Sequence, residues 1–159
     1  MFQRILVGLD GSPLGRLALQ AALELACRYR AQLIALSVVE EPVTGNHEHE
    51  ETESLNYYRQ VQANAVAQAN AAGITLQMAI HRGHATRALV EYAQEVGANL
   101  IVLGATGHEH PWSLTMGGTA CRVISDTTHA VMVVRPPGIA RWVRDIMVRH
   151  VSTVTPQTS

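Results

Sequence analysis

Residues 100–124 read LIVLGATGHEHPWSLTMGGTACRVI and carry the strongest structural signal in the chain. The segment begins with four apolar residues, typical of a strand buried on both faces, and this run breaks at Gly104. Further glycines stand at positions 107, 117 and 118, and the apolar spacing of residues 119–124 predicts a helix. This order favours phosphate binding, because glycine lets the backbone approach a ligand and the first N–H groups of a helix lack internal partners. A glycine-rich turn without a ligand is the alternative interpretation.

The rest of the chain alternates between apolar runs and segments with helical spacing. Strands are expected at Arg4–Leu9, Leu33–Val39, Leu76–Arg82, Leu100–Leu103 and Ala130–Arg135, and helices at residues 13–28, 53–72, 86–96 and 119–124. Five strands separated by helices predict an α/β fold with a parallel sheet covered on both faces, because each parallel pair needs a crossover connection. Residues 40–53 contain six glutamates and two histidines, and we interpret them as a solvated loop.

One globular domain followed by a short tail is the expected organisation. The chain has 159 residues, of which 47% are apolar and 16% charged, which is enough apolar side chain for a sizeable core. We assign residues 1–138 to the domain, because Pro136 and Pro137 end the last strand. In the tail, residues 139–159, the segment Ile139–His150 has the spacing of an amphipathic helix, which we expect to dock on its own domain or on a dimer mate.

Composition excludes several classes of function. The net charge is -1 and the chain has no lysine, which argues against a nucleic-acid surface and excludes a Walker-type P-loop. No apolar run approaches membrane-spanning length, and Gly8 and Asp10 interrupt the early apolar run that a signal peptide would need, so we expect a cytoplasmic protein without membrane contact. Cys27 and Cys121 lack CxxC spacing and are expected to be reduced thiols, with Cys121 a small buried hydrophobe.

The histidines form two notable pairs. His47 and His49 follow the second strand, and His108 and His110 follow the fourth, so both pairs are expected at the carboxyl edge of the sheet. Imidazoles suit zinc, nickel, copper or manganese, but His-x-His in a loop has no fixed ligand geometry. We therefore expect solvated histidines rather than a metal site, with a response to pH near neutrality as a further alternative.

No catalytic constellation stands out in the chain. Ser12, Ser113 and the histidines have no spacing that singles out a base and an orienting acid. A binding protein therefore fits the sequence better than an enzyme.

The chain resembles the universal stress protein (UspA-like) family along nearly its whole core. Shared features are an Ile-Leu-Val strand that ends in Asp-Gly-Ser, a strand that ends in Val-Val-Glu, and the segment Gly97–Gly104. The most specific feature is the family's ATP-binding motif, Gly, two residues, Gly, nine residues, Gly, then serine or threonine. This sequence has Gly104, Gly107 and Gly117 at that spacing, but it departs at the next position, where Gly118 stands and the hydroxyl is displaced to Thr119.

The resemblance implies an open five-stranded parallel sheet with helices on both faces, Rossmann-like and of the adenine nucleotide alpha hydrolase type, with strand order 3-2-1-4-5. It implies ATP or AMP as ligand, together with magnesium or manganese, and a homodimer through the fifth strand. Slow ATP hydrolysis is the most activity that we expect. Asp10 would then meet the ribose or adenine, the backbone of Val38 the adenine, and the glycines the ribose and phosphates. The complete set of implied contact residues is Asp10, Gly11, Ser12, Val38, Gly104, Gly107, Gly117, Gly118 and Thr119.

Two classes of function stay open. The first is a dimeric stress-response or signalling module that binds an adenine nucleotide and acts on an unknown protein partner. The second is a dimeric interaction protein of the same family that has lost tight nucleotide binding. The three-glycine spacing favours the first, and Gly118, in place of a hydroxyl residue that would bond phosphate, favours the second.

Overall fold

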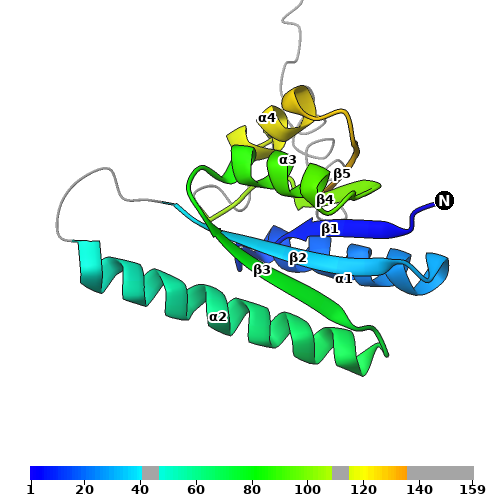
Figure 1. Cartoon of the computed structure of the whole chain (residues 1–159), viewed down its shortest axis with the longest axis horizontal. Helices are drawn as coiled ribbons and strands as arrows, with labels where there is room; N and C mark the ends of the chain where they lie inside the picture. The colour runs from blue at the N-terminus through cyan, green and yellow to red at the C-terminus, as the bar shows by residue number, and fades with distance from the viewer. Residues whose placement is uncertain (41–46, 109–114, 136–159) are drawn as a thin grey trace, which may run out of the picture.

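The computed structural model describes residues 1–40, 47–108 and 115–135 (Figure 1). Its elements are β1 (Arg4–Gly8), α1 (Pro13–Tyr29), β2 (Gln32–Val39), α2 (His47–Ala71), β3 (Leu76–Arg82), α3 (Ala85–Glu95), β4 (Leu100–Gly104), α4 (Gly118–Asp126) and β5 (Ala130–Val134). The predicted tail, residues 139–159, and His110 lie outside the described residues. Within the described residues, no helix is long and apolar enough to cross a membrane.

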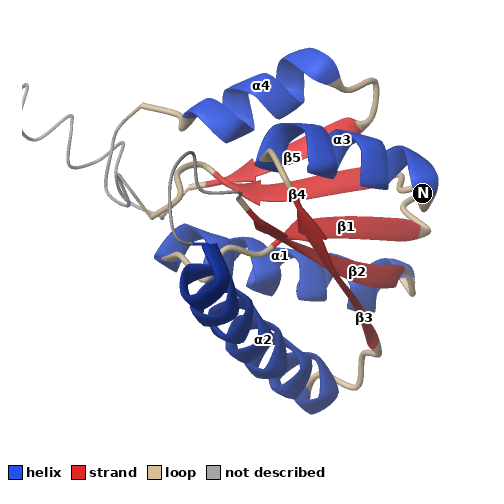
Figure 2. Ribbon diagram, turned by 60° about the vertical axis from the view of Figure 1, so that its left-hand side comes forward, coloured by secondary structure: helices blue, strands red, loops and turns tan. Residues whose placement is uncertain are grey.

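The five strands form one parallel sheet in the order β3-β2-β1-β4-β5. This confirms the α/β fold and the strand order that the resemblance implied. The chain moves outward from β1 in one direction through β2 and β3, and in the other direction through β4 and β5 (Figure 2). Connection direction therefore reverses beside β1, which is the position where open parallel sheets hold ligands at the carboxyl ends of their strands.

Two apolar layers hold the helices on the sheet. Leu19 and Ala22 of α1 and Ala65 of α2 pack on one face of the sheet, against residues such as Ile5 and Val7 of β1. On the opposite face, Leu89 and Ala93 of α3 and Val123 of α4 pack against Leu6 and Ile101. The central strands are buried on both faces, which explains their uninterrupted apolar sequence.

Most predicted boundaries agree with the structure to within one or two residues, and those of β3 agree completely. The start of α2 is wrong: the helix begins at His47, so residues 47–53 are not a loop. Glutamate is a good helix former, and its charge is favourable near a helix N-terminus, so the acidic run extends the helix rather than interrupting it.

The expectation for Cys121 is also wrong. Cys27 and Cys121 are both exposed free cysteines. Each lies next to a buried alanine, Ala26 and Ala120 respectively, and the buried stripe of the helix includes the alanine and excludes the cysteine. Neighbouring side chains on a helix point about 100° apart. A small error in placing the apolar stripe therefore assigns the cysteine, instead of the neighbouring alanine, to the buried face.

Candidate functional site

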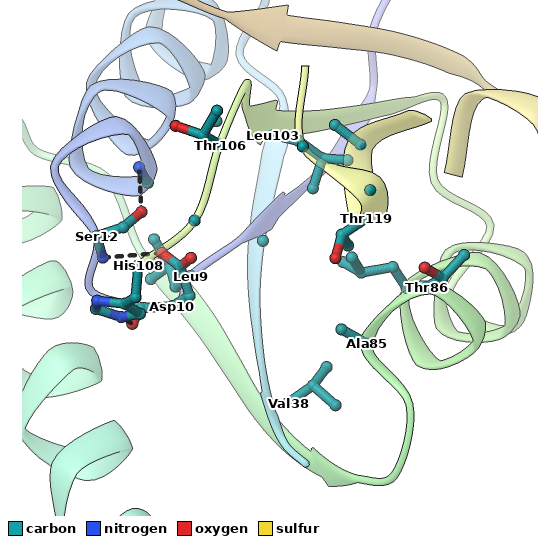
Figure 3. Close-up of a pocket in the computed structure, with 18 of the residues that line it drawn as sticks. Leu9, Asp10, Ser12, Val38, Ala85, Thr86, Leu103, Thr106, His108 and Thr119 are labelled. Carbon is teal, nitrogen blue, oxygen red and sulfur yellow. Dashed lines mark hydrogen bonds between the residues drawn. The ribbon is translucent and has the colours of Figure 1, made fainter. Parts of the chain in front are cut away.

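A cleft of about 860 Å³ opens at the carboxyl ends of β1, β2 and β4 (Figure 3). Its walls include the residues after β1, the end of β2, the first turn of α3 and the loop from β4 into α4. It brings together eight of the residues that the family resemblance implied as nucleotide contacts, namely Asp10, Ser12, Val38, Gly104, Gly107, Gly117, Gly118 and Thr119. Among the predicted contact residues, Gly11 alone is not part of the lining.

Asp10 and Ser12 shape the turn from β1 into α1. Asp10 Oδ1 accepts a hydrogen bond from the Ser12 N–H at 2.9 Å, and Ser12 Oγ accepts one from the Gly15 N–H at 3.0 Å. Ser12 therefore caps α1, as the sequence predicted. The other carboxylate oxygen, Asp10 Oδ2, faces Gly107, where an added Cβ would lie 3.0 Å from it. The carboxylate of Asp10 thus stands between the end of β1 and the glycine loop.

The glycines of the motif and the nearby Gly11 have different structural roles, and two of these glycines, Gly104 and Gly11, serve the fold. A Cβ on Gly104 would lie 2.7 Å from the carbonyl carbon of Leu14 and 2.9 Å from the Gly15 nitrogen, so glycine lets α1 pack directly on the end of β4. Gly11 has a φ of +79°, and a Cβ there would collide with the hydroxyl of Tyr57. The fold alone accounts for both glycines.

The glycines at the start of α4 have another character. Gly117 is the N-cap of α4, with φ -64° and ψ 155°, and its N–H donates to the Ala105 carbonyl at 2.7 Å. Gly118 does not have a positive φ, and a Cβ there would meet no atom of the described residues within 4 Å. The N-cap residue has no side chain with which to cap this helix, so among the described residues its first N–H groups are available to an anion in the cleft. Glycine at position 118 therefore leaves space beside the cleft, and the backbone conformation there does not require it.

Tyr57 and His108 meet at the backbone of Asp10. The Tyr57 hydroxyl donates to the Asp10 carbonyl at 3.0 Å, and His108 Nε2 contacts the same oxygen. The hydroxyl also lies 3.0 Å from His108 Nε2. These contacts tie α2 and the loop after β4 to the end of β1. The sequence predicted a solvated His108, with metal binding or a response to pH as alternatives, and did not predict this contact. It gave no sign of Tyr57, because the position of Tyr57 beside Asp10 depends on how α2 crosses the sheet.

Tyr58 contributes an aromatic wall to the cleft. Burial raises the pKa of Tyr58 to about 12, and the charge of Asp10 is the next largest cause. Burial, followed by the charge of Asp10, also raises the pKa of Tyr57, although Arg16 opposes the effect. Both phenols therefore stay neutral at physiological pH and keep a proton with which to form hydrogen bonds.

Two threonines in the lining have hydroxyls without a partner in the described structure. Thr86 and Thr106 are 4% and 5% exposed, and neither Oγ1 makes a hydrogen bond. Buried hydroxyls are normally satisfied by protein, water or ligand, so these two atoms mark places where the cleft offers a polar contact. No sequence motif singles out either residue.

The histidine candidates are not brought together by the described structure. His47 and His49 lie in the first turn of α2, and the orientation of their side chains is outside the described part. His108 contacts Asp10, and His110 lies outside the described residues. Within the described residues, no group of three His, Cys, Asp or Glu side chains has an arrangement that could hold a metal ion.

Comparisons with known proteins agree with this geometry. The sequence model of the Universal stress protein family matches residues 1–135. Universal stress protein Sll1654 from Synechocystis sp. is 34% identical over 139 residues, which cover 84% of this chain and 86% of that protein. A crystal structure from the universal stress protein family of Burkholderia pseudomallei has a TM-score of 0.70 and 27% identity, and covers 84% of this chain and 96% of that one.

A further solved structure is described as a universal stress protein in complex with cAMP. It has a TM-score of 0.67 and 25% identity, and the match covers 84% of this chain and 97% of that one. The family match extends over the five strands and the cleft that lies at their carboxyl ends. The chain belongs to the universal stress protein family.

Proposed function

We propose that this protein is an adenine-nucleotide-binding module for stress response or signalling, and that ATP or AMP occupies the cleft beside β1. The observation that carries the proposal is the uncapped N-terminus of α4, where Gly118 leaves open space on the cleft side. A relative that is 25% identical is described in complex with cAMP, which supports an adenine nucleotide as the ligand class. Binding, rather than rapid turnover, is the proposed activity.

The residues around the cleft suggest how the nucleotide would lie. The backbone at Val38 and the half-buried ring of Tyr58 would face the base, and Asp10 Oδ2 would accept a ribose hydroxyl. The first N–H groups of α4 and the hydroxyl of Thr119 would donate to phosphate oxygens. Magnesium or manganese would accompany the nucleotide and offset phosphate charge, because the cleft lining contains one arginine, Arg122, and no lysine.

Nucleotide retained through purification is the direct test of this proposal. Heating the purified protein should release an adenine nucleotide that chromatography identifies, and calorimetric titration of the stripped protein with ATP and AMP should give micromolar to millimolar dissociation constants. Magnesium should strengthen ATP binding more than AMP binding, because ATP carries more phosphate charge. If neither nucleotide binds at millimolar concentration, the interaction-protein alternative takes the place of the proposal.

We also propose a homodimer that forms through β5. This strand is at one edge of the sheet, so one row of its backbone N–H and C=O groups has no strand partner among residues 1–40, 47–108 and 115–135. Met132 on β5 is 36% exposed, and Met78 on the other edge strand, β3, is 43% exposed, which makes a matched pair of positions.

Met132→Arg should convert the protein to a monomer at tens of micromolar, because it places a charge at the proposed interface. Met78→Arg, the same change at the opposite edge, should leave the dimer intact. Sedimentation velocity of the parent and of both variants distinguishes the states. A monomeric parent, or dissociation caused by Met78→Arg alone, contradicts an interface at β5.

A further inference from the structure

A second cavity of about 360 Å³ lies between α3 and α4. Its lining consists of His84, Thr86, Arg87, Val90, Glu91, Arg122 and Asp126. Three of these residues, His84, Thr86 and Arg122, also line the main cleft. The two cavities therefore share a wall, which is built from the first turn of α3 and from a side chain of α4.

The N-terminus of α3 is uncapped. Its N-cap, His84, is extended, with φ -81° and ψ 125°, and forms no side-chain hydrogen bond to the helix. By contrast, Ser12 caps α1, which begins at the same edge of the sheet. The helix has 11 residues, so its first N–H groups and its dipole both favour an anion at this end.

Thr86 gives an independent indication of a ligand. It is the second residue of α3, it is 4% exposed, and its Oγ1 has no hydrogen-bond partner in the described structure. Figure 3 shows its oxygen on the cleft side of α3, turned toward the α4 segment that carries Thr119. A buried hydroxyl without a partner is unfavourable, and here it adjoins N–H groups that also lack partners.

The charges around the shared wall favour an anion. Arg122 is exposed and forms no ion pair with the described residues, so its guanidinium can turn onto a bound group. Arg87 is paired with Glu91 at 2.7 Å, which neutralises that carboxylate. Asp126 opposes an anion, but it is the last residue of α4, at the end of the helix away from the main cleft. The donors therefore concentrate where the two cavities meet.

We propose that the groove between α3 and α4 is a second anion-binding subsite, in which the α3 N–H groups, the Thr86 hydroxyl and the Arg122 guanidinium hold a phosphoryl group. The group is either free inorganic phosphate or the distal phosphates of a nucleotide in the main cleft. Binding of the distal phosphates rests on the proposed nucleotide function, whereas binding of inorganic phosphate does not.

Titration with inorganic phosphate, followed by NMR of the backbone amides, tests the subsite without any nucleotide. Phosphate at up to about 20 mM should shift the amides of residues 85–87 in the parent. Thr86→Val, which keeps the shape of the side chain, and Arg122→Gln should each weaken this response at least about fivefold. Arg28→Gln, at an exposed arginine on α1 that lines neither cavity, should not change it.

The controls separate this subsite from the α4 site. Gly118→Val changes the first residue of α4 and should leave the response at residues 85–87 unaltered. A response confined to residues 118–120, or none at all, overturns the proposal. Melting temperatures verify that the variants are folded. If Thr86→Val does not fold, Arg122→Gln still tests the subsite, because Arg122 is exposed and its replacement should not disturb the core.

A nucleotide comparison then identifies the source of the phosphoryl group. If the distal phosphates of ATP occupy the groove, the ratio of ATP to AMP affinity should fall about fivefold in Thr86→Val. If that ratio is unchanged while the phosphate response is weakened, free phosphate is the occupant. A phosphate response in a protein that binds no adenine nucleotide supports the subsite and contradicts only the proposed nucleotide function.

Discussion

Replacing Gly118 by valine should weaken adenine-nucleotide binding by about 100-fold or more, while the melting temperature stays within about 2 °C of the parent value. A Cβ at this position meets no atom within 4 Å in the part of the chain that the structure describes, and Gly118 does not have a positive φ. Valine is also a better helix former than glycine, so α4 should not be weakened. The branched side chain would instead occupy the space over the first N–H groups of α4, where phosphate is proposed to bind.

Gly118→Ser is the matched change in the other direction. It restores the hydroxyl of the family motif at the first position of α4, and a hydrogen bond to a charged group stabilises a complex by about 1.5 to 3 kcal/mol, so ATP should bind about tenfold tighter or more. Calorimetric titrations and thermal melts of the parent, serine and valine proteins measure both quantities. Equal ATP affinity in all three would show that phosphate does not approach α4.

The fold was largely predictable because its signals are local. Most strands are short apolar runs that a glycine or proline follows within three residues. A strand buried on both faces needs no alternation, so Leu100–Gly104 stands out directly. The acidic run after β2 was not predictable in the same way. Glutamate is common both in solvated loops and on exposed helix surfaces, and composition alone does not distinguish them for residues 47–53.

The candidate site was predictable only as far as strand ends determine it. Asp10 follows β1, and Val38 and Gly104 lie at the carboxyl ends of β2 and β4, so the topology brings them to one edge. Tyr57 reaches Asp10 through the path of α2 over the sheet, and Thr86 enters the wall through the packing of α3 against α4. No sequence motif indicates either contact, because both depend on tertiary packing between segments that are distant in the sequence.

The glycine motif illustrates the same limit. Gly104 and Gly118 flank one loop and look equivalent in the sequence, yet the first contacts the backbone of α1 and the second faces open space. Only the identity of the neighbouring atoms separates a glycine that serves packing from one that serves a ligand. The same substitution should therefore destabilise the fold at Gly104 and leave its stability nearly unchanged at Gly118.

Gly104→Ala should therefore lower the free energy of unfolding by about 2 to 3 kcal/mol, which corresponds to a fall of about 4 to 12 °C in melting temperature for a domain of this size. A Cβ there would lie 2.7 Å from the Leu14 carbonyl carbon, and backbone atoms of a packed helix cannot move aside as the end of a flexible side chain can. Gly118→Ala adds the same methyl group in open space and is the matched control, with stability expected within about 0.5 kcal/mol of the parent. Urea unfolding without nucleotide measures both variants and removes any contribution from ligand. Equal stabilities would mean that α1 can shift away from β4 at little cost, and the role of Gly104 would then have to lie with the nucleotide.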